Sequence, residues 1–371
     1  MKRNPFLPIT VFSLLVATVF FAVDPARACT SLTIKSADGG VMYGRTMEFG
    51  FELDSEAVVI PRNYALKGTG PDGKPGKTWT SKYAATGMNA FKLPVLVDGV
   101  NEKGLAGGIL YFPGYSEYTT PADANASESV APWEFLTWVL TSFASVDEVK
   151  AAIDQVEVIG LKMPQLGAVP PFHYTVHDES GKSIVIEPIG GKLKVYDNPY
   201  GVMTNSPTFD WHLTNLSNYV KLTPENVAPL KVGGQDIPSF GEGSGWLGIP
   251  GDPTPPSRFI RALAFSMTSD PEPAGERSVR LVEHIMNNFD IPKGTIRNDE
   301  KMADYTQWTT VSDLKNRRYY VKTYENQILQ GIDLMAFDLD AKEVVSTAVE
   351  PVIAPPALFQ LGRRGQAIIY H

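Results

Sequence analysis

Apolar and polar residues alternate with the period of two that is typical of β-strands over residues 30–36 (TSLTIKS) and 41–49 (VMYGRTMEF). The four residues between them, ADGG, are a strong turn signal, so we expect a β-hairpin. Residues 173–197 repeat the pattern as three strands joined by Ser-Gly and Gly-Gly turns. Residues 307–334 predict another meander.

Between these strand blocks, apolar residues recur at helical spacing. The pattern predicts two helices within residues 131–156, and Ser145 with Glu148 resembles a capping box at the start of the second. A second helical pair is expected over residues 255–267 and 276–289. The order strands, helices, strands, helices, strands favours antiparallel sheets covered by helices. The predicted fold class is therefore α+β, rather than a parallel βαβ sheet.

The amino-terminal segment has the pattern of a secretory signal peptide. A basic start precedes an apolar run at residues 9–23, and Ala-Arg-Ala follows at 26–28. We therefore expect residues 1–28 to be removed and the mature protein to be exported, to the periplasm or the medium, without stable membrane insertion. No linker marks a boundary after this point, so residues 29–371 are expected to form one domain.

The net charge, and motifs that lack the sequence context they require, exclude several classes of function. The whole chain carries a net charge of −8, and loss of the leader, with its net charge of +2, leaves about −10, which argues against a nucleic-acid partner. Residues 243–248 (GSGWLG) match a dinucleotide-binding pattern, but no strand precedes them and Pro250 follows. His173 and His177 have no third ligand nearby. The sequence predicts neither a metal nor an organic cofactor.

Cys29 is the single cysteine of the chain, and it comes directly after the predicted cleavage site. A lone cysteine is often a small buried hydrophobe. A cysteine behind a leader can also be lipidated, which would make the protein a periplasmic lipoprotein, although Arg27 fits such a signal poorly. In the interpretation that we favour, cleavage exposes an N-terminal nucleophile. Its α-amino group, with a pKa of about 7.7–8.0, then accepts the thiol proton.

Four long motifs carry a resemblance to a known family. They are residues 29–49, 100–113 (VNEKGLAGGILYFP), 201–219 (GVMTNSPTFDWHLTNLSNY) and 248–265 (GIPGDPTPPSRFIRALAF). In this order they resemble the choloylglycine hydrolases, which are N-terminal nucleophile hydrolases that include bile salt hydrolases and penicillin V acylases. The resemblance implies an αββα sandwich in which two mostly antiparallel sheets are covered by helices.

The resemblance also implies roles for residues near the new amino terminus. Cys29 matches the nucleophile, and Arg45 matches the arginine beside it, whose cation favours thiolate. Glu48 stands where the family usually carries an aspartate that orients the amino group, so the role comes with a different geometry.

Three further matches complete the implied catalytic set. Asn205 matches the asparagine whose amide donates to the oxyanion, and the backbone N–H of Tyr111 matches the second donor. Arg258 matches the distal arginine of the charged site. Together these residues imply thiolate attack on an amide carbonyl, protonation of the leaving amine by the terminal ammonium, and hydrolysis of a thioester.

The expected partner is a small N-acyl amide. The tyrosine at position 111 is similar to the residue that penicillin V acylases commonly carry there, whereas bile salt hydrolases commonly carry asparagine. Aromatic residues are expected at the entrance and wall of the site: Phe49, Phe51, Phe112 and Tyr115. The sequence therefore favours a penicillin V acylase that also accepts N-acyl homoserine lactones, with bile salt hydrolysis as the alternative. The resemblance also implies a homo-oligomer, a tetramer by the habit of the family.

Overall fold

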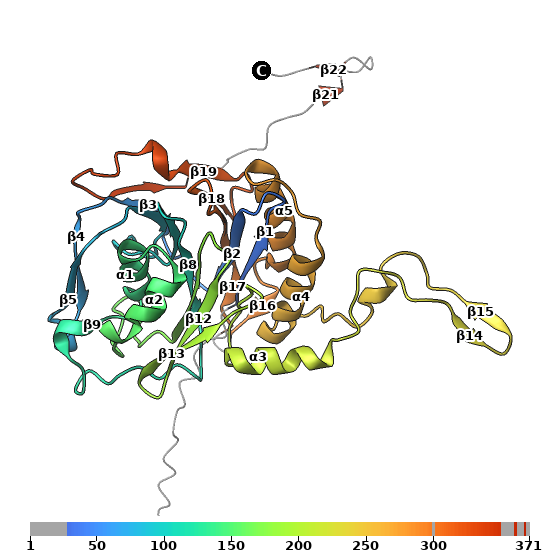
Figure 1. Cartoon of the computed structure of the whole chain (residues 1–371), viewed down its shortest axis with the longest axis horizontal. Helices are drawn as coiled ribbons and strands as arrows, with labels where there is room; N and C mark the ends of the chain where they lie inside the picture. Colours follow the sequence, from blue (N-terminus) through green and yellow to red (C-terminus); the bar gives the residue numbers. More distant parts are fainter. Residues whose placement is uncertain (1–27, 299–300, 350–359, 362–366, 369–371) are drawn as a thin grey trace, which may run out of the picture.

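Two antiparallel sheets pack face to face with helices on both outer sides (Figure 1). This is a computed structural model, and it describes residues 28–298, 301–349, 360–361 and 367–368. Apart from Ala28, the predicted signal peptide lies outside the described residues. The layer order is helices, sheet, sheet, helices, which confirms the αββα sandwich expected from the resemblance.

The larger sheet has eight strands in the order β13-β12-β11-β8-β7-β6-β3-β20. Three of them, β11, β12 and β13, form the antiparallel meander predicted for residues 173–197. The strands span Glu56–Ile60 (β3), Ala85–Met88 (β6), Asp98–Asn101 (β7), Ala106–Tyr111 (β8), Phe172–His177 (β11), Ser183–Ile189 (β12), Lys192–Asp197 (β13) and Val345–Ala348 (β20).

The smaller sheet follows the order β1-β2-β17-β18-β19, with β16 beside β17. Its first pair is the predicted hairpin, in register with Cys29 opposite Met47 and Ser31 opposite Arg45. The predicted meander at 307–334 supplies most of β17 and all of β18 and β19. The strands span Cys29–Lys35 (β1), Val41–Phe49 (β2), Ile296–Arg297 (β16), Ala303–Asp313 (β17), Arg318–Thr323 (β18) and Gln330–Asp333 (β19).

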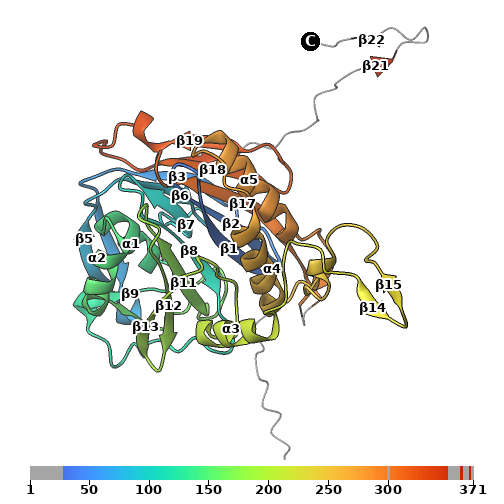
Figure 2. The same cartoon turned by 45° about the vertical axis from the view of Figure 1, so that its right-hand side comes forward.

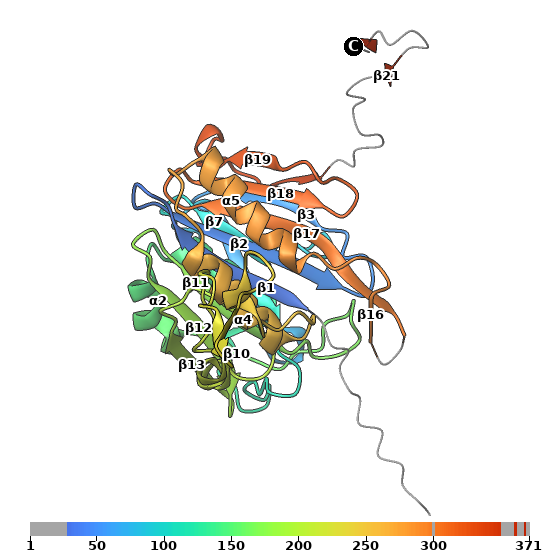
Figure 3. The same ribbon diagram turned by 90° about the vertical axis from the view of Figure 1, so that its right-hand side faces the viewer.

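Both predicted helical pairs are present, one on each outer face. Helices α1 (Phe135–Ser142) and α2 (Val146–Ala152) belong to the side of the larger sheet, and α4 (Pro255–Thr268) and α5 (Glu276–Met286) cover β1, β2 and β17 (Figure 3). Half of the predicted capping box is present: the Glu148 N–H donates to Ser145 Oγ at 3.3 Å, but the Glu148 carboxylate accepts from the N–H of Ala144, one residue before the N-cap, at 2.9 Å. A further short helix is α3 (Phe209–Asn215). Short strands elsewhere are β4 (Ala65–Thr69), β5 (Pro75–Thr80), β9 (Ser129–Val130), β10 (Glu157–Val158), β21 (Gln360–Leu361) and β22 (Ala367–Ile368).

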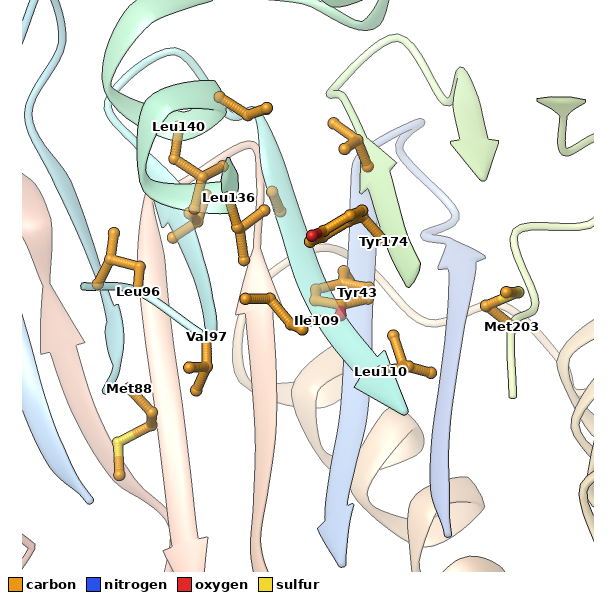
Figure 4. Packing of buried hydrophobic residues seen from close by; sticks show 14 of the residues in the cluster. Tyr43, Met88, Leu96, Val97, Ile109, Leu110, Leu136, Leu140, Tyr174 and Met203 are labelled. Carbon is orange, nitrogen blue, oxygen red and sulfur yellow. The ribbon is translucent and has the colours of Figure 1, made fainter. Parts of the chain in front are cut away.

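The main apolar core lies between the two sheets and continues under the helices. Figure 4 shows part of it: Tyr43 of β2 lies between the sheets, whereas Ile109 and Tyr174 lie on the face of the larger sheet that α1 covers, where Tyr174 packs on Phe135 with ring centroids 4.5 Å apart. Every residue of β2 and β8 is buried, because each strand has a sheet on one side and helices on the other. Helix α5 approaches β2 so closely that a Cβ on Gly44 would lie 2.4 Å from a Val282 methyl group. A polar side chain on these strands therefore needs a protein partner.

A long excursion between α3 and α4 carries a hairpin that the sequence does not predict. Strands β14 (Leu230–Val232) and β15 (Gln235–Ile237) project away from the sandwich (Figure 2). The GSGWLG motif lies in the same excursion, in a loop with one 3-10 turn at Ser244–Trp246, which agrees with the loop predicted from the sequence. Within the described ranges, no helix has both the length and the hydropathy that crossing a bilayer would require.

Candidate active site

Cys29 begins β1 and opens on a strongly apolar cavity. The space among its lining atoms, with open solvent at the mouth included, is about 490 Å³. The polar groups among its lining side chains are the Cys29 thiol, the Glu48 carboxyl group, the Tyr111 hydroxyl and the Trp133 indole N–H. The full lining is Cys29, Met47, Glu48, Phe49, Leu53, Ala90, Phe91, Val97, Ile109, Tyr111, Trp133, Met163, Leu166 and Phe172. The free thiol of Cys29 thus lies in a pocket suited to an apolar group.

The guanidinium group of Arg45 is a buried cation beside this thiol. The β1–β2 register places it opposite Ser31, and its Nη2 lies 3.5 Å from Cys29 Sγ. The guanidinium also donates to the carbonyls of Val97 at 3.0 Å and Ile109 at 2.7 Å. Burial lowers the pKa of Arg45, but negative charge at Cys29 and Asp98 outweighs it and the net shift is upward. The side chain therefore remains charged, as expected for a residue that favours thiolate.

Asn205 joins the Cys29 nitrogen to the rest of the site. Met203 forms a β-bridge with Ser31, which lays residues 203–205 along β1. Asn205 Oδ1 then accepts from the Cys29 nitrogen and from Arg258 Nη2, each at 2.7 Å. Since both partners are donors, the side-chain oxygen must face them.

The amide nitrogen of Asn205 donates to the carbonyl of Tyr111 at 2.8 Å. The family resemblance predicts that this nitrogen and the Tyr111 backbone N–H both donate hydrogen bonds to the oxyanion. An amide nitrogen has two hydrogens, so the second one is the candidate for the oxyanion. The structure thus brings Asn205 and Tyr111 together, and it adds a role as acceptor that the sequence does not show.

Arg258 lies in the first turn of α4 and is buried. It donates to the carbonyl of Cys29, to Thr30 Oγ1 at 2.7 Å and to Asn205. Burial lowers the pKa of Arg258 to about 10, against the opposing effect of Glu48 and Cys29. The distal arginine is therefore in the predicted place, and it fixes the start of β1.

Glu48 lies in the cavity wall, but its hydrogen bond differs from the predicted one. Its Oε1 accepts from Thr306 Oγ1 at 2.7 Å, whereas the group bonded to the Cys29 nitrogen is Asn205. Burial raises the pKa of Glu48 to about 7, and Arg258 and Thr306 oppose that shift. The carboxyl group is therefore close to half-ionised at neutral pH.

The predicted aromatic wall is only partly correct. Phe49 lines the cavity, and Phe51 packs edge-on against it with ring centroids 4.8 Å apart. Phe112 and Tyr115 do not line this cavity. Strand alternation directs Phe112 to the face opposite Tyr111, where it stacks on His173 at 4.3 Å, and Tyr115 stacks on Phe112.

Most cavity residues were not identified from the sequence. Trp133, Met163 and Leu166 come from loops around α1 and before β11, and Phe91 follows β6. They are apolar residues without a chemical motif, so the sequence offers no signal that separates them from core residues. Among the described residues, no three His, Cys, Asp or Glu side chains are grouped so that they could bind a metal.

Comparisons with known proteins agree with this geometry. Residues 29–347 match the family model described as linear amide C–N hydrolases, choloylglycine hydrolase family. The chain is 38% identical to a bile salt hydrolase/transferase of Clostridium perfringens, over 85% of this chain and 95% of that protein. It is 28% identical to a penicillin V acylase of Pectobacterium atrosepticum, over 90% and 88% of the two chains.

Solved structures show the same relationship. A mutant of the conjugated bile acid hydrolase from C. perfringens superposes with a TM-score of 0.80 at 35% identity, covering 89% of this chain and 99% of the other. A penicillin V acylase from Agrobacterium tumefaciens gives a TM-score of 0.69 at 25% identity, covering 86% and 90%. The chain therefore belongs to the choloylglycine hydrolase family, and it is a hydrolase of linear amide C–N bonds.

Proposed function

We propose that this enzyme hydrolyses amides that join a bulky apolar acyl group to a small polar amine, with conjugated bile salts as the preferred class. The observation that carries the proposal is the cavity at Cys29, whose lining is almost wholly apolar. Such a cavity stabilises a large hydrophobic acyl group by burying its surface. The relatives named as bile salt hydrolases are more similar to this chain than those named as penicillin V acylases. This reverses the order favoured by the sequence alone.

In the proposed mechanism, Cys29 is the nucleophile. Removal of residues 1–28 converts its nitrogen from an amide into an amine, which accepts the thiol proton when it is neutral. Arg45 stabilises the thiolate at 3.5 Å. The thiolate attacks the amide carbonyl, the terminal ammonium protonates the departing amine, and water hydrolyses the thioester. Asn205 holds the same nitrogen, and its second amide hydrogen stabilises the oxyanion.

Penicillin V is the second candidate substrate, because the Tyr111 side chain itself lines the cavity. Its ring packs edge-on against Phe49 at 6.5 Å and against Phe172 at 5.7 Å. These three rings form an aromatic wall suited to a phenoxyacetyl group. A long acyl chain of an N-acyl homoserine lactone would use the same apolar surface.

Maturation, export and assembly are part of the same proposal. A periplasmic or secreted location fits a nucleophile that cleavage of the leader creates.

The β14–β15 hairpin supports assembly into homo-oligomers, because Leu230, Val232, Ile237 and Phe240 are all exposed on it. A two-stranded hairpin is marginally stable alone, and clustered exposed apolar residues mark protein contacts. A second copy of this chain is the proposed partner.

A substrate panel tests the choice of amide. Mature enzyme is assayed side by side on glycocholate, penicillin V and a long-chain acyl homoserine lactone, and kcat/KM is compared. Glycocholate is expected to be cleaved fastest, and the Cys29→Ser variant controls for contaminating activity. A higher kcat/KM for penicillin V would overturn the ranking while leaving the amidase assignment intact.

A further inference from the structure

A buried carboxylate, Asp98, lies at the sheet interface close to Arg45. It begins β7 and is fully buried. Its Oδ2 accepts hydrogen bonds from Thr310 Oγ1 and from the Tyr319 hydroxyl, both at 2.8 Å. Since both donors belong to the smaller sheet and Asp98 to the larger one, the carboxylate connects the two sheets.

The missing side chain of Gly108 makes room for this carboxylate. Gly108 on β8 pairs with Asp98 on β7. A Cβ at Gly108 would lie 2.4 Å from the Tyr43 hydroxyl, 3.2 Å from Asp98 Oδ1 and 3.6 Å from Arg45 Cδ. The Tyr43 hydroxyl, the Asp98 carboxylate and the Arg45 side chain therefore lie close together around Gly108.

The same two strands position Arg45. Its guanidinium donates to the carbonyls of Val97 and Ile109, which are the chain neighbours of Asp98 and Gly108. These carbonyls satisfy its N–H groups but carry no net charge, and a buried cation also needs an anion. The groups whose negative charge raises the pKa of Arg45 are, largest first, Cys29, Asp98 and Tyr43. Arg45 thus has the Cys29 thiol and the Asp98 carboxyl group in its surroundings.

We propose that Asp98 is the resident counter-ion of Arg45, and that it acts through Arg45 to position and moderate the Cys29 thiol. Asp98 does not line the cavity, so it is a positioning residue that touches no substrate. Its negative charge offsets part of the field that Arg45 exerts on the thiol. Without that charge, the field of Arg45 would act on the sulfur unopposed and favour a less nucleophilic thiolate, because nucleophilicity falls as a thiol becomes more acidic.

The charged and titratable groups around this pair come from four elements. Glu48 and Tyr43 share β2 with Arg45, Arg258 comes from α4, and Tyr319 comes from β18, while the thiol and the amino group belong to Cys29. Tyr43 is held neutral, because burial and the charge of Asp98 raise its pKa well above the ordinary value. A change at Asp98 alone leaves all these other groups in place.

The test is the pH dependence of Cys29 alkylation in the mature Asp98→Asn variant. Iodoacetamide rates are followed by intact mass, and the expected midpoint falls by about one pH unit because an opposing charge is lost. One unit of added acidity lowers thiolate reactivity about threefold, so at pH values where the thiol is fully ionised we expect kcat to fall about threefold with KM unchanged. Asp313→Asn is the matched control, since Asp313 is also fully buried and accepts from Asn316 at the far end of β17. Its midpoint should not move.

A second variant keeps the test decisive if Asp98→Asn fails to fold. Thr310→Val with Tyr319→Phe removes both donors to Oδ2. Burial already raises the pKa of Asp98, so without these donors the carboxyl keeps its proton and the same downward shift is expected. An unchanged or higher midpoint in a folded variant overturns the proposal. The inference rests on Cys29 as the nucleophile, but alkylation does not depend on the substrate. A wrong substrate assignment would therefore leave this result unaffected.

Discussion

Substituting Glu48 by glutamine tests whether the site contains a destabilising buried carboxyl group. Burial raises the pKa of Glu48 from 4.5 to about 7. One pKa unit corresponds to about 1.4 kcal/mol, so the ionised carboxylate destabilises the folded state by about 3 kcal/mol relative to an exposed glutamate. This magnitude follows from the loss of water around the carboxyl group, which Arg258 and Thr306 compensate only in part.

The sign of the pH effect follows from the two pKa values. In the unfolded chain Glu48 loses its proton near pH 4.5, and in the folded chain near pH 7. Between these values the folded state holds the additional proton, so the free energy of unfolding falls as the pH rises. The parent chain should therefore lose about 3 kcal/mol from this group by pH 8. The Glu48→Gln variant has no such proton and should not show this loss.

Urea unfolding at pH 5 and pH 8 measures the difference. A chain that retains Ala28 is used, because its Cys29 nitrogen is an uncharged amide. At pH 5 the variant should match its parent within about 1 kcal/mol, and at pH 8 it should be more stable by about 3 kcal/mol. Glu343→Gln, at an exposed loop position, is the control and should leave the pH slope unchanged. Parallel pH slopes for the Glu48→Gln variant and its parent would refute the reasoning.

Three other changes test the catalytic and assembly proposals. Cys29→Ser should lower kcat at least a hundredfold, because a serine hydroxyl is a poor nucleophile without a strong base; near-parental turnover on the preferred substrate would contradict this. Retaining Ala28 should lower kcat by about 10²–10⁴-fold, since an amide nitrogen cannot act as a base, and full activity of a chain confirmed by intact mass would disprove the N-terminal mechanism. Leu230→Ser with Phe240→Ser should give smaller particles in sedimentation experiments, with kcat retained by each subunit; an unchanged sedimentation coefficient would exclude the hairpin as the contact.

Local patterns were sufficient to predict much of the fold. The hairpin at Cys29–Phe49 followed from its alternation and its ADGG turn, and the start of α2 followed from Ser145 and Glu148. The β14–β15 hairpin was not predicted, because it is short and lies in a long excursion with no strong alternation. Helix α3 was also missed, because only seven residues form it.

The residues of the candidate catalytic set could be predicted from the sequence, but the hydrogen bonds between them could not. Arg45, Asn205 and Arg258 were named from motifs, and the structure brings all three to Cys29. Which atoms meet depends on tertiary contacts: the bridge between Ser31 and Met203 brings Asn205 beside Cys29, and the two donors there, the Cys29 nitrogen and Arg258, require the Asn205 oxygen to face them.

The sequence by itself predicted the family, the candidate nucleophile and the main blocks of strands and helices, because each depends on residues that are close together along the chain. Only the tertiary structure decided the shape of the acyl cavity, the exclusion of Phe112 from it and the partners of Glu48. The physical reason is that these properties depend on which face of a strand a side chain takes and on which distant loop packs against it. Both are fixed only when the two sheets close on a common core.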